Sequence, residues 1–177
     1  MDVFEAIEKR HSYRGEFKDT PVPRDDLRRI VEAGVRAPSG MNLQTTSFVI
    51  VDDAEVLTRI AEISGNKVIA GARALIACVG QEVPMRPGSD LSFEVEDCAA
   101  ATENMLLAIT ALGYATVWID GMLRREDRAA RIGELLGVPS DRTVRIVLPI
   151  GVPAEECAQL EKRSFEERAC FNRWGQS

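Results

Sequence analysis

Apolar positions along the chain recur at two spacings, and each spacing predicts one kind of element. Apolar residues three and four positions apart predict amphipathic helices at 2–9, 24–36, 55–63, 92–112 and 125–137. Short, nearly continuous apolar runs predict buried strands at 47–53, 74–80, 116–119 and 143–153. Helices and short strands alternate irregularly in this order, which favours an α+β fold over a regularly alternating α/β one.

Length and motifs narrow the class further. A chain of 177 residues without internal repeats or linkers suits one domain covering 1–177. No Gly-x-Gly-x-x-Gly follows the first strand, and no P-loop lysine motif is present. The two common nucleotide-binding folds therefore lack their signatures.

Charge and hydropathy exclude several function classes. The formal net charge of −6 argues against a general nucleic-acid or anionic-membrane surface, so an anion site must be a local cluster of cations. The chain starts with acids instead of a basic signal-peptide region, and its longest apolar-rich stretch, 105–119, falls short of a membrane span. We expect a cytoplasmic protein that binds neither membrane nor nucleic acid.

The cysteines and the histidine do not suggest a metal site. The four cysteines are far apart, without a Cys-x-x-Cys pair, and His11 is the single histidine, so a zinc site is not expected. Cys78 and Cys98 stand among apolar residues, and we expect them to be small buried hydrophobes without a disulfide.

A cationic cluster follows the first predicted helix in the stretch KRHSYR, 9–14. Arg10 and Arg14 bracket Ser12, and two planar guanidinium groups with one hydroxyl match the oxygens of a phosphate monoester. The alternative is a solvated helix end with surface arginines, because charged residues are common there.

An uncharged polar stretch, PSGMNLQ at 38–44, follows the second predicted helix. Ser39 and Gly40 permit close backbone approach, and the amides of Asn42 and Gln44 each offer a donor and an acceptor. These groups suit the edge of a heterocycle. A turn that ends the helix is the alternative.

Two further stretches are weaker candidates. WIDGM at 118–122 ends a strand in Asp120 and Gly121, where glycine is compatible with a ligand close to the backbone or with a plain turn. Lys162 and Arg163 form a basic pair in the acidic stretch LEKRSFEE at 160–167, which taken alone is an ordinary surface pair.

The order of these stretches resembles that of the nitroreductase family of FMN-dependent oxidoreductases. Arg-x-Ser-x-Arg comes first, then Pro-Ser-Gly-x-Asn-x-Gln, a long alanine-rich helix ending in LGY, WIDG and a late Lys-Arg pair, so the resemblance covers nearly the whole chain. It implies a mixed, largely antiparallel central sheet flanked by helices. It also implies an intertwined homodimer with FMN at the subunit interface.

The resemblance also implies which residues hold FMN. The phosphate, the ribityl chain and part of the ring would lie against Arg10, His11, Ser12 and Arg14, and Lys162 or Arg163 would also reach the phosphate. The partner subunit would line the flavin with Pro38, Ser39, Gly40 and Asn42. Asp120 and Gly121 would place a backbone N–H at flavin N5, and Asn66, with Lys67, would contact the pyrimidine edge.

The implied activity needs no metal and no catalytic side chain, because the flavin carries the reactive chemistry. NADH or NADPH would reduce FMN and leave, and a small acceptor such as a nitroaromatic or a quinone would follow in a ping-pong scheme. The alternatives are a flavin-binding sensor or store, a flavin-fragmenting or dehalogenating relative, and a cofactor-free interaction module. Thr45 and Thr46 replace the usual Pro-Trp and remove an aromatic side chain, so we expect an open, shallow acceptor site.

Overall fold

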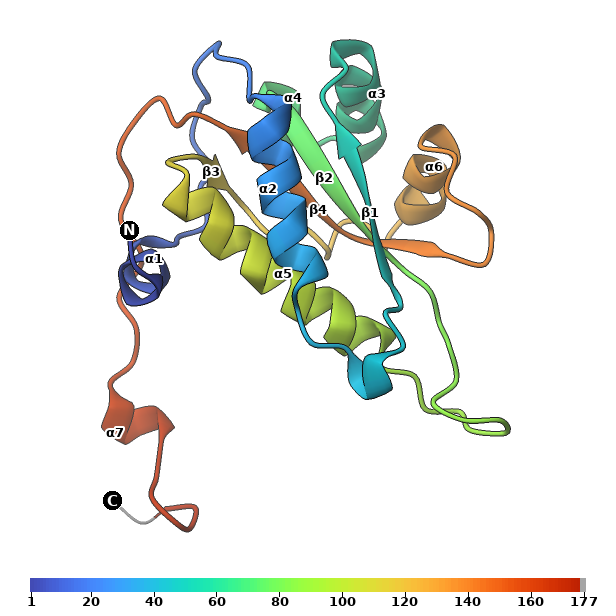
Figure 1. The fold of residues 1–177 in the computed structure, drawn as a ribbon. Coiled ribbons are helices and arrows are strands. Elements are labelled where there is room, and N and C mark those ends of the chain that lie inside the picture. Colours follow the sequence, from blue (N-terminus) through green and yellow to red (C-terminus); the bar gives the residue numbers. More distant parts are fainter. Residues whose placement is uncertain (176–177) are drawn as a thin grey trace.

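The computed structural model describes residues 1–175, which form a four-stranded antiparallel sheet with helices on both faces (Figure 1). The α-helices are α1 (Val3–Lys9), α2 (Arg24–Val35), α3 (Ala54–Ser64), α4 (Lys67–Gly71), α5 (Glu94–Ala111), α6 (Arg128–Leu135) and α7 (Phe165–Arg168), and a 3₁₀ turn, η1, spans Gly40–Asn42. The strands are β1 (Thr46–Val51), β2 (Ala74–Gly80), β3 (Ala115–Thr116) and β4 (Thr143–Gly151).

The sheet has the strand order β1-β2-β4-β3, and each pairing among these strands is antiparallel. β2 is central and buried at all of its positions. Its side chains alternate between the two faces of the sheet, as the pleat requires. Ile76 and Cys78 pack towards α2 and α5, whereas Leu75 and Ala77 pack towards α3 and α6. The continuous apolar run of this strand follows from burial on both faces.

The long helix α5 provides one wall of the first core. Met105 and Ile109 of α5 pack with Leu27 and Ile30 of α2 over the sheet, and Figure 1 shows α2 crossing α5 in front of the strands. The second core lies on the opposite face, beneath α3 and α6, and contains Ile60 from α3. This arrangement confirms the predicted helix-flanked sheet.

Both ends of the chain expose apolar side chains. In α1 the apolar face consists of Val3, Phe4 and Ile7, with exposed fractions of 57%, 75% and 47%, so it does not face the core. The C-terminal arm, residues 155–175, runs past α1 and away from the sheet (Figure 1). It exposes Leu160, Phe165, Phe171 and Trp174. Within residues 1–175 no helix is long and apolar enough to cross a membrane.

Candidate functional site

The Arg10–Arg14 segment is held against the edge of the sheet by Tyr13. The Tyr13 side chain is fully buried, and its backbone N–H donates to the carbonyl oxygen of Thr116 in β3 at 2.8 Å. Its hydroxyl donates to the backbone oxygen of Glu16. Because Tyr13 points inward, the neighbouring Ser12 and Arg14 are exposed. The segment therefore presents its polar side chains outward from a fixed backbone.

His11 has one ring nitrogen that is buried and has no hydrogen-bond partner within residues 1–175. Its Nδ1 lies 2.9 Å from the backbone oxygen of Lys9. Only a protonated Nδ1 can donate to a carbonyl, so the neutral ring carries its acceptor lone pair on Nε2. Within residues 1–175, Nε2 is buried without a hydrogen-bond partner, and so is Oγ1 of Thr116. An unpaired buried polar atom is costly, so these two atoms reduce the stability of the packing around Tyr13.

Two cations, Arg14 of this segment and Lys67 of α4, line one hollow on the protein surface. The hollow has a volume of about 920 Å³, and Arg14 and Lys67 line it together with Arg73, Glu155 and other residues. Arg73 forms an ion pair with Asp19, with 3.5 Å between Arg73 Nη1 and Asp19 Oδ1. Arg14 and Lys67 are exposed and come from segments more than fifty residues apart. The sequence predicted Arg14 as a phosphate-binding residue. It predicted Lys67 only as a neighbour of Asn66 at the pyrimidine edge.

Asn66 has a structural task that its predicted role did not include. It is the N-cap of α4, and its Oδ1 accepts hydrogen bonds from the backbone N–H groups of Val68 and Ile69, at 2.9 and 3.3 Å. The cap uses the amide oxygen and leaves the Nδ2 donor for another contact. The cap also places Lys67 at the first position of α4.

A strained loop, residues 39–45, follows α2 and is called the 39–45 loop here. Met41, Asn42 and Gln44 have positive φ angles of 52°, 55° and 52°. Three left-handed residues other than glycine within four positions are costly, and such strain often marks a functional site. Ser39 Oγ accepts from the backbone N–H of Gln44 at 3.2 Å. Pro38 and Asn42 are exposed.

One chain does not bring the 39–45 loop to the Arg10–Arg14 segment. The segment follows α1, whereas the loop lies beyond the N-terminal end of α5, and Figure 1 shows the two regions well separated. The structure thus keeps Arg10, His11, Ser12 and Arg14 in one segment that reaches from Glu103 of α5 to the hollow beside α4. It leaves Pro38, Ser39, Gly40 and Asn42 in a second group.

Asp120 and Gly121 lie where the chain leaves the sheet. Ile119 bridges Val147 of β4, and the Asp120 carboxylate accepts a hydrogen bond from Arg124 Nη2 at 2.8 Å. Asp120 also lines a partly enclosed cavity of about 390 Å³ with Trp118 and other, mainly apolar, residues. A Cβ at Gly121 would meet nothing within 4 Å, so the space over this backbone is open to another molecule.

Lys162 and Arg163 lie on the C-terminal arm and are both exposed. The structure does not bring them to Arg10 or Arg14. The arm starts beside the Arg10–Arg14 segment, however, because Gln159 Nε2 donates to the backbone oxygen of Arg10 at 2.6 Å. Sequence reasoning missed Gln159, since a glutamine in a polar tail carries no signal of its own.

Arg10 is the least exposed cation of the segment. Its guanidinium lies 3.7 Å from the Glu103 carboxylate on α5, and 22% of its side chain is exposed. The ion pair aligns Arg10 along α5 and neutralises part of its charge. Ser12, Arg14 and Lys67 therefore give this region its local polar and positive character on an acidic protein.

Comparisons with known proteins assign most of this chain to one family. The model of the nitroreductase family matches residues 7–82 and 66–152. The chain belongs to the nitroreductase family. This nitroreductase-family chain is 35% identical over 157 residues to a protein of Methanothermobacter thermautotrophicus that is provisionally named an NADH dehydrogenase/NAD(P)H nitroreductase, covering 88% of this chain and 79% of the relative.

Two more members of the family are similar along most of the chain. The NADPH-flavin oxidoreductase of Vibrio harveyi is 31% identical over 160 residues, covering 84% of this chain and 65% of that protein. The structure of an FMN-dependent nitroreductase from Clostridium difficile R20291 superimposes with a TM-score of 0.81 at 26% identity, covering 97% of this chain and 99% of the other. The fold and oxidoreductase class expected from the sequence are thus confirmed.

Proposed function

We propose that this nitroreductase-family protein is an FMN-dependent oxidoreductase that takes hydride from NADH or NADPH and passes it to a small acceptor, such as a nitroaromatic or a quinone. One observation carries the proposal. The Arg10–Arg14 segment exposes Ser12 and Arg14 from a fixed backbone, and Arg14 shares a hollow of about 920 Å³ with the exposed Lys67. A phosphate group forms charge-assisted hydrogen bonds with such cations and accepts a further bond from a hydroxyl group such as that of Ser12.

The residues of this chain fit FMN in several places. Ser12 and Arg14, with Arg10, would hold the phosphate, and Lys162 or Arg163 on the C-terminal arm would add charge to it. His11 would lie beside the ribityl chain. A phosphate of about −2 charge can bind several cations, and the contact of Gln159 with Arg10 brings the C-terminal arm past this segment.

The ring would lie between Asn66 and the strand end. Asn66 Nδ2 and Lys67 would contact the pyrimidine edge, and the backbone at Asp120 and Gly121 would donate towards N5 from beside the open space over Gly121. When bound, FMN supplies N5 as the atom that accepts and gives hydride, so NAD(P)H and the acceptor can use one position in turn. These donors would orient the ring and would stabilise negative charge near it.

The site would require two copies of the chain. The 39–45 loop is separate from the Arg10–Arg14 segment within one chain, so Pro38, Ser39, Gly40 and Asn42 would line the flavin of the neighbouring subunit. The exposed apolar residues of α1 and of the C-terminal arm support this arrangement, because large apolar side chains at exposed positions often mark a subunit interface. If the two subunits exchanged their C-terminal arms, these apolar side chains would be buried between the subunits.

The first experiment is the visible spectrum of the purified protein, followed by anaerobic addition of NADH or NADPH. We expect a yellow protein that is bleached by one of the two and regains its colour with a nitroaromatic or a quinone. Binding of FMN without bleaching would indicate a sensor or store, and consumption of the flavin or of a halogenated compound would indicate the other relatives. A colourless protein that fails to bind added FMN would contradict the proposal.

A further inference from the structure

The 39–45 loop cannot be held by its own contacts alone. Its internal bonds are two 3₁₀-type backbone bonds of 3.0 Å and the contact of Ser39 Oγ with the Gln44 N–H. These must offset left-handed conformations at Met41, Asn42 and Gln44, which the side chains disfavour. Strained backbone of this kind persists only where surrounding structure fixes it. The source of the constraint is therefore outside the loop.

Asp97 of α5 binds both ends of the loop with one carboxylate. Its Oδ1 accepts from the backbone N–H of Gly40 at 2.8 Å, and its Oδ2 accepts from Thr45 Oγ1 at 2.7 Å. Asp97 and Thr45 have exposed fractions of 4% and 2%. Buried hydrogen bonds to a charged acceptor are among the strong ones. The carboxylate thus spans the loop from its second residue to its last.

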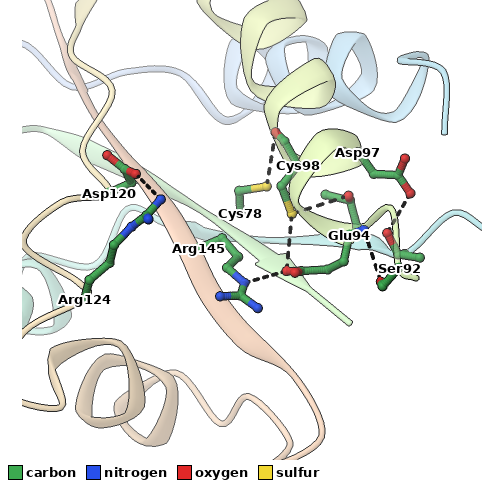
Figure 2. A network of polar contacts seen from close by, with 10 residues as sticks. Cys78, Ser92, Glu94, Asp97, Cys98, Asp120, Arg124 and Arg145 are labelled. Carbon is green, nitrogen blue, oxygen red and sulfur yellow. Dashed lines mark hydrogen bonds and ion pairs between the residues drawn. The ribbon is translucent and has the colours of Figure 1, made fainter. Parts of the chain in front are cut away.

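The Asp97 carboxylate lies at the N-terminal end of α5. It lies in the first turn of α5, where the unpaired N–H groups of a helix stabilise negative charge. Within the part of the chain that the structure describes, no lysine, arginine or histidine forms an ion pair with it. Figure 2 shows Asp97 on α5 close to Glu94 and Cys98. The side-chain contacts of this carboxylate are therefore its hydrogen bonds to Gly40 and Thr45 of the loop.

Gly40 permits the close approach that these bonds require. A Cβ at position 40 would lie 2.3 Å from the ring of Phe93, the residue just before α5. Any larger residue would push the loop away from α5 and lengthen the bond from the Gly40 N–H to Asp97. The glycine, the buried acid and the buried threonine therefore act as one unit.

We propose that Asp97 is a positioning residue that holds the 39–45 loop in the shape required to line the flavin of the neighbouring subunit, with Thr45 as its hydroxyl partner. The inference rests on the proposed function and extends it to two residues outside the predicted site. Asp97 touches neither cofactor nor substrate; it fixes the backbone from which Ser39, Gly40 and Asn42 are presented.

The test compares two substitutions of one residue. Thr45→Val keeps the shape and removes the hydroxyl, whereas Thr45→Ser keeps the hydroxyl. We expect Thr45→Val to raise the Kd for FMN by about tenfold, measured by quenching of flavin fluorescence, and Thr45→Ser to restore it to near the wild-type value. Amide exchange at Gly40 in the cofactor-free protein should accelerate in Thr45→Val but not in Thr45→Ser.

A matched control separates the loss of this contact from the loss of any buried hydroxyl. Thr102→Val makes the same change at a fully buried threonine of α5. Within residues 1–175 its hydroxyl has no hydrogen-bond partner, so it does not hold the 39–45 loop. This variant should leave both the Kd for FMN and the exchange at Gly40 unchanged.

If Thr45→Val does not fold, a second variant tests the same positioning role. Asp97→Asn keeps an acceptor for the Gly40 N–H but removes the negative charge from both bonds. We expect a severalfold rise in the Kd for FMN together with faster exchange at Gly40. An Asp97→Asn protein with the wild-type Kd and wild-type exchange would overturn the positioning role.

The outcomes distinguish the two proposals. An unchanged Kd in a folded Thr45→Val protein, with only a lower Tm, would overturn the positioning role and leave the proposed function intact. Failure of the wild-type protein to bind FMN would overturn the proposed function and this role with it. Faster exchange at Gly40 together with a raised Kd supports both.

Discussion

Arg145 of β4 donates from Nε to the Glu94 carboxylate of α5 at 2.6 Å, and the Glu94 side chain is only 3% exposed (Figure 2). The pair joins the first turn of α5 to the beginning of β4. The backbone of β2 makes room for it, because a Cβ at Gly80 would lie 1.6 Å from Glu94 Oε1. Glu94 also lies three positions before Asp97, so the pair helps to fix the helix turn on which the 39–45 loop depends.

Removal of the cation from this pair should destabilise the fold. Arg145→Met leaves Glu94 buried without its partner, and we expect a loss of about 3 kcal/mol in the free energy of unfolding, since Arg145 is partly exposed. Urea denaturation at neutral pH measures it. The double variant Glu94→Gln with Arg145→Met should lose less than the sum of the two single changes. Additive losses would contradict direct coupling.

Gly80→Ala should be at least as damaging as the loss of the ion pair. The new methyl group would occupy the position of the Glu94 carboxylate and force it from its buried site, so we expect a loss of about 3 kcal/mol or more. Gly133→Ala in α6 is the matched control, because its Cβ would be 3.7 Å from the nearest side chain. Equal unfolding midpoints for the two variants would rule out this explanation.

Substitution of Arg14 or Lys67, the two exposed cations of the hollow beside α4, should weaken FMN binding with little effect on the fold. Arg14→Ala and Lys67→Ala should each raise the Kd by roughly ten- to a hundredfold, which corresponds to one hydrogen bond to a charged group. Fluorescence titration of the cofactor-free protein provides the measurement. Arg28→Ala, at an exposed position of α2, is the control. Wild-type affinity in both site variants would show that these cations belong to an ordinary surface.

Tyr114 should make the protein less stable in alkaline solution. Burial and a hydrogen bond to Asp26 Oδ2, of 2.7 Å, raise the pKa of Tyr114 to about 12. The unfolded chain ionises nearer pH 10, so the folded state binds this proton more tightly. The stabilisation is complete below about pH 10 and is lost as the pH rises towards about 12. Urea midpoints across this range should fall more steeply for the wild type than for Tyr114→Phe.

Much of the fold could be predicted because apolar spacing reports burial. The strand predicted at 74–80 has those bounds, and the helix predicted at 92–112 spans Glu94–Ala111. The spacing could not reveal α4, whose five residues are fewer than two helical turns. The helix predicted from 125 begins only at Arg128, because Glu126 and Asp127 adopt left-handed conformations.

The strand predicted at 116–119 was only partly right. Regular pairing covers Ala115–Thr116, and Ile119 returns to β4 through a single bridge. Between them the chain carries Val117 into the second core and Trp118 towards the first. An apolar run shows burial, but it does not show which of its residues pair with a neighbouring strand.

The candidate site residues were predicted from the order of their motifs, whereas the neighbours of these residues depend on the fold. Nothing local indicates that Tyr13 bonds to Thr116, since that contact follows from the pairing of β3 with β4. Cys78 and Cys98 are buried, as predicted, with exposed fractions of 0% and 1%. Thr45 was expected to matter through the aromatic residue missing beside it, yet its observed contact is a hydrogen bond to Asp97.

The separation of the Arg10–Arg14 segment from the 39–45 loop has a consequence for cells that carry two alleles. In the proposed dimer, each pocket takes one group from each chain. A mixed dimer of an Arg14→Ala chain and a Thr45→Val chain would therefore contain one pocket with both defects and one with neither. Two inactive alleles could complement each other, whereas two alleles altered in the same segment could not.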